Sequence, residues 1–136
     1  MTDLYLFTIM FVLTLAFANG SNDVSKAVAT LVGSGVTSYR TAIFWGAWWT
    51  LAGALASGFL ATAMVKTFAR GMVAAEGTFP PELALSVLAG ASAWVLFASR
   101  TGVPVSTTHA LTGAIVGGGL VALGSQGLLW SGITAK

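Results

Sequence analysis

The chain contains no cysteine and a single histidine among its 136 residues. Without cysteine there is no disulfide framework, no thiolate metal site and no cysteine nucleophile. The one histidine, His109, has no acidic residue near it in the sequence, so no arrangement of nucleophile, base and acid is indicated. We therefore predict that the protein is not an enzyme and that it needs no cofactor.

Charged residues are also scarce. They make up 7% of the chain, with six Lys or Arg against four Asp or Glu, whereas 56% of the residues are hydrophobic and the mean hydropathy is +0.87. So few charges cannot cover the surface of a soluble domain, and the scattered bases form no patch for nucleic acid. The composition predicts an all-α integral membrane protein that crosses the cell membrane several times, with the lipid bilayer and no nucleic acid as its partner.

Long uninterrupted hydrophobic runs are few. Only Thr41–Val65 is typical of a plain spanning helix, about 38 Å long at 1.5 Å per residue. Small residues recur along it at every fourth position, a pattern that favours close helix packing. We predict about four membrane segments, separated by a polar break at 19–23, a solvent loop at 69–82 and a polar helix start at 99–109.

The two polar interruptions have two interpretations. Broken or re-entrant helices at membrane depth are tolerated only where they line a cavity or lie inside protein, and paired interruptions are typical of transporter binding sites. The alternative is a set of ordinary helices joined by short surface loops.

The first apolar run, Leu4–Ala18, ends in Ala16-Phe17-Ala18, which is similar to a signal-peptidase site. Its first residues, however, include no Lys or Arg and carry the acid Asp3. We therefore expect this run to be retained as a membrane segment.

An acid and a base follow this run, in Asn19-Gly20-Ser21-Asn22-Asp23-Val24-Ser25-Lys26. Asp23 and Lys26 are three residues apart, which places them on one side of a helix. Ionisable groups at membrane depth are costly and are usually functional. We predict that Asn22, Asp23 and Lys26 form a coupling-ion site or an ion pair, with Ser21 as a further candidate.

The second polar segment is Pro104-Val105-Ser106-Thr107-Thr108-His109. Proline disfavours helix at the residue before it, and Ser106, Thr107 or Thr108 can cap a helix over 110–123. The unpaired N–H groups and the positive dipole end of such a helix favour an anion. We predict that these hydroxyl residues bind a phosphate or sulfate oxyanion, with Arg100 and His109 as further candidates. A plain capped helix at the membrane surface is the alternative.

Both segments resemble the signature blocks of the inorganic phosphate transporter (PiT) family of cation-coupled symporters. Residues 19–35 read N-G-S-N-D-V-S-K-A-V-A-T-L-V-G-S-G, similar to that family's G-A-N-D-V-A-N-A block followed by G-T-x-V-G-S-G. Residues 104–109 are similar to its P-V-S-T-T-H block. The resemblance implies transport of inorganic phosphate coupled to Na⁺ or H⁺, with the cation at Asn22 and Asp23 and phosphate at Ser106–Thr108.

One departure from the family pattern bears on the coupling ion. Lys26 stands where the better-known members have Asn. Either its ammonium supplies the positive charge of a bound cation, or it simply pairs with Asp23. Both interpretations question sodium coupling at this point and make a proton the alternative coupling ion.

The resemblance also implies an architecture. Family members resemble two inverted copies of a unit such as 1–136, and segment 19–35 has no second match within 36–136. We expect one half of an inverted-repeat transporter, completed by an antiparallel second copy or by a separately encoded other half, or else a fragment of a longer gene. A carrier of another oxyanion such as sulfate and a non-transporting structural membrane subunit are the alternative functions.

Overall fold

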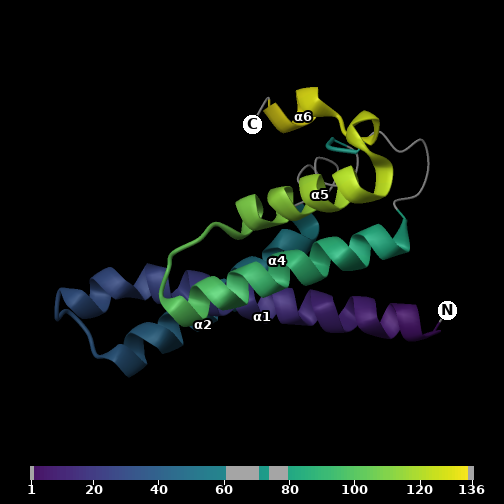
Figure 1. Ribbon diagram of the computed structural model, residues 1–136. Helices are drawn as coiled ribbons and strands as arrows, with labels where there is room; N and C mark the ends of the chain where they lie inside the picture. Colours follow the sequence, from purple (N-terminus) through teal and green to yellow (C-terminus); the bar gives the residue numbers. More distant parts are fainter. Residues whose placement is uncertain (1, 61–70, 74–79, 135–136) are drawn as a thin grey trace.

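A computed structural model describes residues 2–60, 71–73 and 80–134 (Figure 1). Apart from one isolated β-bridge, its regular structure is helical in these residues. The elements are α1 (Thr2–Gly33), α2 (Tyr39–Leu60), α4 (Pro81–Thr101), α5 (Thr107–Leu123), a 3-10 turn (Ser125–Gly127) and α6 (Trp130–Thr134). The predicted all-α architecture is therefore confirmed for the described part of the chain.

The predicted break at 19–23 is wrong, because α1 runs through these residues as one helix (Figure 1). The segment contains no proline, and a single internal glycine weakens a helix by only about 1 kcal/mol. The Ser21 hydroxyl donates within α1, to the carbonyl oxygens of Phe17 at 2.9 Å and Ala18 at 3.0 Å. The helix is polar at this point rather than interrupted.

The second predicted interruption does exist, between α4 and α5. The helix α4 continues through Ser99–Thr101, further than the apolar run, and ends at Gly102, whose φ of 73° is left-handed. Glycine adopts this conformation without steric cost. Residues 103–106 then lead to α5, with Pro104 among them and Ser106 as the N-cap. The polar helix start predicted over 99–109 thus begins only after residue 102.

Three packing contacts organise the long helices. Helix α1 packs against both α2 and α4, and α4 also packs against α5, so that α4 lies between α1 and α5 (Figure 1). The close approach of α1 and α2 centres on Gly46, where a Cβ atom would lie 3.0 Å from Val28 Cγ1 and 3.1 Å from Val24 Cγ1. The small-residue face predicted on residues 41–65 is therefore used at Gly46, and Ala42 on the same face is buried. Residues 61–65 of that predicted span lie outside the described residues.

The core lies between α4, α5 and the segments that flank them. Its buried members are Met72, Val73, Leu83, Val87, Ile115 and Leu128. Met72 and Val73 fall within the predicted solvent loop at 69–82, and their burial contradicts that prediction. The reason is tertiary: Val73 forms an antiparallel bridge with Leu128, and the Leu129 N–H donates to Met72 O at 3.0 Å. Residues 69–70 and 74–79 of the predicted loop lie outside the described residues.

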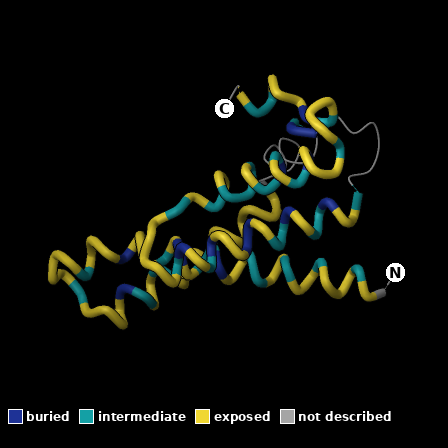
Figure 2. The backbone as a smooth tube through the Cα atoms, viewed as in Figure 1, coloured by how far each residue is buried: buried dark blue, intermediate teal, exposed yellow. Residues whose placement is uncertain are grey.

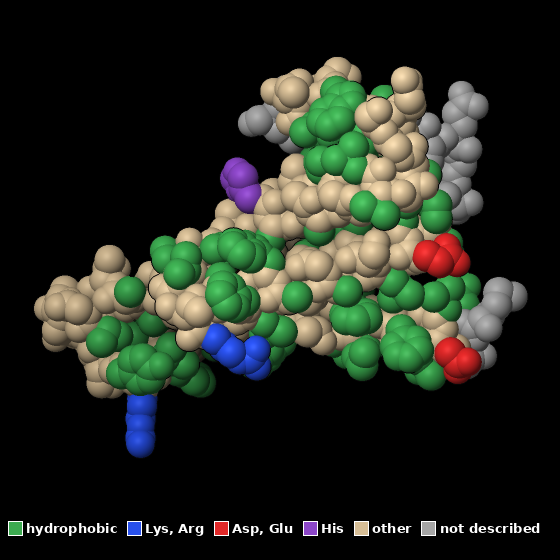
Figure 3. Space-filling view, in the orientation of Figure 1, with side chains coloured by type: hydrophobic (Ala, Val, Ile, Leu, Met, Phe, Trp, Pro, Cys, Tyr) green, Lys and Arg blue, Asp and Glu red, His purple; other side chains and the backbone are tan. Residues whose placement is uncertain are grey.

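Most residues of the long helices are exposed or partly exposed (Figure 2), and many of the exposed side chains are large and apolar (Figure 3). Phe59 is 86% exposed and Val121 is 91% exposed, and all three Trp residues of α2 are more than half exposed. In the described part of the chain, the helical segments Asp3–Gly33 and Pro81–Thr101 are long and apolar enough to cross a membrane. An apolar surface of this extent suits contact with lipid or with further membrane helices.

Candidate functional site

The site lies where the middle of α1 meets the connection before α5. The buried side chain of Asn22 donates from Nδ2 to Val105 O at 2.8 Å, across 83 residues of sequence. The Lys26 ammonium donates to the same carbonyl oxygen at 2.6 Å. Asn22 and Lys26 are four residues apart, so both lie on the face of α1 that meets Val105.

Asp23 is bonded to the same two donors. Its Oδ1 lies 3.1 Å from Lys26 Nζ and 3.4 Å from Asn22 Nδ2. Two donors and two acceptors thus form a closed network in which each donor contacts both oxygens. The predicted ion pair exists, and its lysine also reaches the connection before α5, which the spacing of the two residues does not reveal.

A second contact joins the same two elements one turn earlier on α1. The Thr107 hydroxyl donates to Asn19 Oδ1. Asn19 precedes Asn22 by three residues, so both asparagines lie on the face of α1 that meets residues 105–107. Asn19 and Val105 are the two site residues that were not predicted as such.

The capping of α5 explains why the Val105 carbonyl is free to accept from α1. A helix that began one residue earlier would pair Val105 O with the N–H of His109, four residues on. Instead, the His109 N–H donates to the Ser106 side chain at 3.4 Å, and the first helical bond runs from Ala110 N to Ser106 O at 3.0 Å. Ser106 thus ends the helix one residue short of Val105, which leaves that carbonyl oxygen to Asn22 and Lys26.

The predicted anion-facing helix start has unpaired donors. Within the described residues, the backbone N–H groups of Thr107 and Thr108 have no hydrogen-bond acceptor. The Thr107 hydroxyl is committed to Asn19, whereas the Thr108 side chain is exposed. The donors available for an anion are therefore chiefly these two N–H groups and the Thr108 hydroxyl.

The remaining candidates are less closely involved. Ser21 is exposed and bonds only within α1. Arg100 is exposed near the end of α4, and its side chain forms no hydrogen bond or ion pair with the described residues. His109 is also exposed on the first turn of α5.

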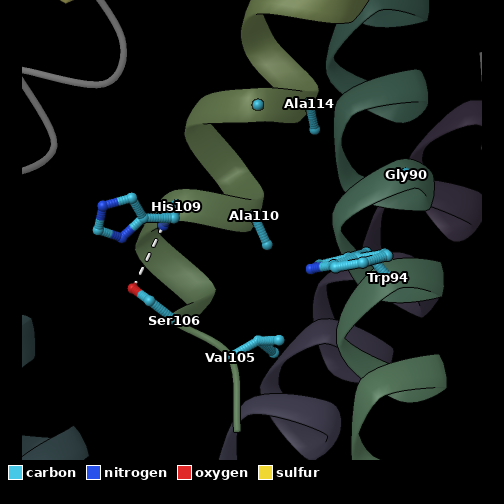
Figure 4. Close-up of a pocket in the computed structure, with 8 residues that line it drawn as sticks. Gly90, Trp94, Val105, Ser106, His109, Ala110 and Ala114 are labelled. Atoms are coloured by element: carbon cyan, nitrogen blue, oxygen red, sulfur yellow. Dashed lines mark hydrogen bonds between the residues drawn. The ribbon is translucent and has the colours of Figure 1, made fainter. Parts of the chain in front are cut away.

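A pocket of about 550 Å³ lies between α4 and α5, next to this site. Its lining is mainly apolar and consists of Gly90, Trp94, Val105, Ser106, His109, Ala110, Gly113 and Ala114. Figure 4 shows Val105, Ala110 and Ala114 directed toward Trp94, whereas the His109 imidazole points away from it. The residues that line the pocket do not include Asn22, Asp23 or Lys26. A mainly apolar pocket without these polar side chains is poorly suited to bind a strongly hydrated anion.

With this geometry in place, comparison with known proteins decides the family. Residues 19–136 match the profile of the phosphate transporter family. The chain belongs to this family. It is 37% identical over 136 residues to a probable low-affinity inorganic phosphate transporter of Mycobacterium leprae (strain TN), a match that covers 98% of this chain and 32% of the relative.

Two further relatives agree. Inorganic phosphate transporter 2-1, chloroplastic, from Arabidopsis thaliana is 37% identical over 131 residues, which cover 93% of this chain and 22% of that protein. A solved structure, "The sodium-dependent phosphate transporter", is similar with a TM-score of 0.73 and 35% identity over 99% of this chain and 34% of its own. The chain thus spans about a third or less of the length of these relatives.

These matches confirm the family resemblance that residues 19–35 and 104–109 carry. The relatives are named as phosphate transporters and not as enzymes, in agreement with the prediction from the sequence. The family places the chain in a membrane, as its composition predicts.

Proposed function

We propose that the chain forms part of a cation-coupled carrier of inorganic phosphate in the cell membrane. The observation that carries this proposal is the junction of α1 with the start of α5. Asn22, Asp23 and Lys26 lie against the residue that precedes Ser106–Thr108, so that a charged network adjoins a helix N-terminus with unpaired donors. Membership of the phosphate transporter family supports phosphate as the anion.

In the proposed mechanism, the anion binds at the start of α5. The backbone N–H groups of Thr107 and Thr108, the Thr108 hydroxyl and the positive end of the helix dipole stabilise its charge. Ser106 holds the helix start in place as its cap, and Asn19 fixes the Thr107 side chain. The coupling cation, Na⁺ or H⁺, acts at Asn22 and Asp23, next to the anion, where opposite charges favour each other's binding.

The proposed site is completed by protein beyond this unit. The Asp23 side chain is 53% exposed although it lies within an apolar helix, and a carboxylate at membrane depth needs protein or water around it. The relatives are about three times as long as this chain. We infer that an inverted second unit, either an antiparallel copy or a separately encoded half, covers this face. Reporter fusions at the C-terminus will show both orientations for a copy, and one orientation plus a required partner for a separate half.

The direct test is uptake of labelled phosphate by proteoliposomes that contain the protein, with Na⁺ and proton gradients imposed separately. We expect uptake driven by one of these gradients, and excess unlabelled phosphate will compete with it. Competition by sulfate but not by phosphate would instead assign another oxyanion. No uptake under either gradient, from protein that is inserted and helical, would favour a structural subunit.

Point substitutions test the anion site itself. Thr108→Val removes an exposed hydroxyl that has no hydrogen-bond partner among the described residues, whereas Thr112→Val, one turn further along α5, removes a hydroxyl bonded only to Thr108 O. A hydrogen bond to a charged group is worth about 1.5–3 kcal/mol, which corresponds to roughly a 10- to 150-fold change in affinity. We expect Thr108→Val to raise the half-saturating phosphate concentration within this range and Thr112→Val to leave it unchanged. Equal values for both variants would show that Thr108 does not bind phosphate.

A further inference from the structure

The environment of the Lys26 ammonium is that of a bound monovalent cation. Its Nζ lies 2.6 Å from a backbone carbonyl oxygen, of Val105, and 3.1 Å from a carboxylate oxygen, of Asp23. Carboxylates and carbonyls of non-helical backbone are the ligands with which membrane transporters hold coupling cations. Here both oxygens are already bonded to a positive charge that is covalently attached to the protein.

The charge balance at this point is complete. Asp23 and Lys26 bring one negative and one positive charge, and the other members of the network, Asn22 and the Val105 carbonyl, are neutral. A sodium ion added to the same oxygens would have to displace the ammonium from both of them and would leave two positive charges beside one carboxylate. Like charges at such separations repel each other, and the repulsion grows as further protein replaces the water around this partly exposed pair.

We propose that the Lys26 ammonium replaces a coupling sodium ion at Asp23, so that this site carries its positive charge permanently and binds no Na⁺. This inference rests on the proposed function in that it assigns Asp23 to the transport site. It narrows the choice of coupling ion, because Na⁺ that does not bind at Asp23 cannot couple a sodium gradient to transport at that residue. A related solved structure bears the name of a sodium-dependent transporter, so the proposal predicts a difference in sodium binding between this chain and that protein.

The proposal predicts how sodium binding changes when Lys26 is replaced. Lys26→Gln still offers an N–H donor to Val105 O, now from an amide, but removes the positive charge. Lys26→Asn also removes the charge and carries its amide on a shorter side chain. We expect each variant to bind one more Na⁺ per chain than the wild type, measured by equilibrium dialysis of ²²Na⁺ against choline. Lys26→Arg retains the positive charge and is expected to bind no additional Na⁺. The double variant Asp23→Asn/Lys26→Gln, without the carboxylate, is expected to lose the additional ion.

Two outcomes overturn the proposal. One is wild-type sodium binding by a Lys26→Gln or Lys26→Asn protein whose helical circular dichroism is intact. The other needs no Lys26 variant to fold: if Asp23→Asn binds one Na⁺ fewer than the wild type, Asp23 holds sodium while Lys26 is present. We expect Asp23→Asn and the wild type to bind the same number of Na⁺ ions.

Uptake measurements separate this inference from the proposed function. In proteoliposomes, we expect replacement of external Na⁺ by choline to reduce phosphate uptake at least 10-fold more in Lys26→Gln than in the wild type. If the wild-type protein takes up no phosphate under any gradient, the proposed function fails, and ²²Na⁺ binding still decides the role of Lys26.

Discussion

The closed network between α1 and the connection to α5 makes a quantitative prediction, because its two donors share their acceptors. In Asn22→Ala, Val105 O and Asp23 Oδ1 both retain Lys26, and in Lys26→Met both retain Asn22. Each single variant therefore loses hydrogen bonds but leaves no oxygen without a partner. Each variant loses two hydrogen bonds, and at about 0.6–1.5 kcal/mol for each bond we expect it to lower the free energy of unfolding by about 1–3 kcal/mol.

The double variant Asn22→Ala/Lys26→Met differs in kind, because both oxygens then lose every described partner. An unsatisfied buried polar group costs about 1–3 kcal/mol. Val105 is only half-buried and Asp23 is 53% exposed, so water compensates for part of this cost. We expect the double variant to be destabilised by about 1 kcal/mol more than the sum of the two single variants.

The cycle consists of the wild type, the two single variants and the double variant. The free energy of unfolding of each is measured by titration with sodium dodecyl sulfate in mixed micelles, followed by circular dichroism. Ser21→Ala combined with Lys26→Met is the matched control, since the Ser21 hydroxyl bonds only within α1. Its effects are expected to add within about 0.5 kcal/mol, as they do for independent sites. If the destabilising effects of Asn22→Ala and Lys26→Met also add within about 0.5 kcal/mol, the shared network is refuted.

Three further substitutions and one control variant test the site and the fold. Asp23→Asn is expected to abolish phosphate uptake in proteoliposomes while the helical circular dichroism is retained, and near-normal uptake would remove Asp23 from the mechanism. Gly46→Leu forces side-chain atoms into Val24 and Val28 and is expected to destabilise the protein by about 1–3 kcal/mol in detergent unfolding. Gly53→Leu, with open space at its Cβ, is the control and is expected to stay within about 0.5 kcal/mol of the wild type. Gly102→Ala places a Cβ at a φ of 73° and is expected to cost about 1–2 kcal/mol in the same assay, so an unchanged midpoint would show that the α4 end adapts freely.

The sequence predicted the helix ends well where the residues that cause them lie at the ends themselves. Proline, glycine and a run of hydroxyl residues between 102 and 108 end one helix and begin the next, and each acts on its own backbone or on that of its neighbours. The polar residues at 19–23 have the same appearance in the sequence, yet they do not interrupt α1. Ser21 satisfies its hydroxyl on the preceding turn, and Asn22 finds its partner on another element.

Burial was less predictable, because it depends on partners distant in the sequence. Met72 and Val73 lie between a stretch of polar and charged residues and two prolines, which is why residues 69–82 appear to be a solvent loop. They are covered by Leu128 and its neighbours, which follow α5 more than 50 residues later. No local property of either segment reveals this pairing.

The site shows the same limit at atomic scale. Asp23 and Lys26 could be predicted to pair, because ionisable side chains at helical spacing in an apolar chain are a distinctive pattern. Val105 could not, because it contributes only a carbonyl oxygen, and every residue has one. What makes this carbonyl available is the hydroxyl of the next residue: Ser106 takes the His109 N–H and so starts α5 after Val105. The cap that the sequence predicts for the anion helix therefore also leaves the Val105 carbonyl oxygen free to hold Lys26, so that Ser106 links the start of α5 to the network on α1.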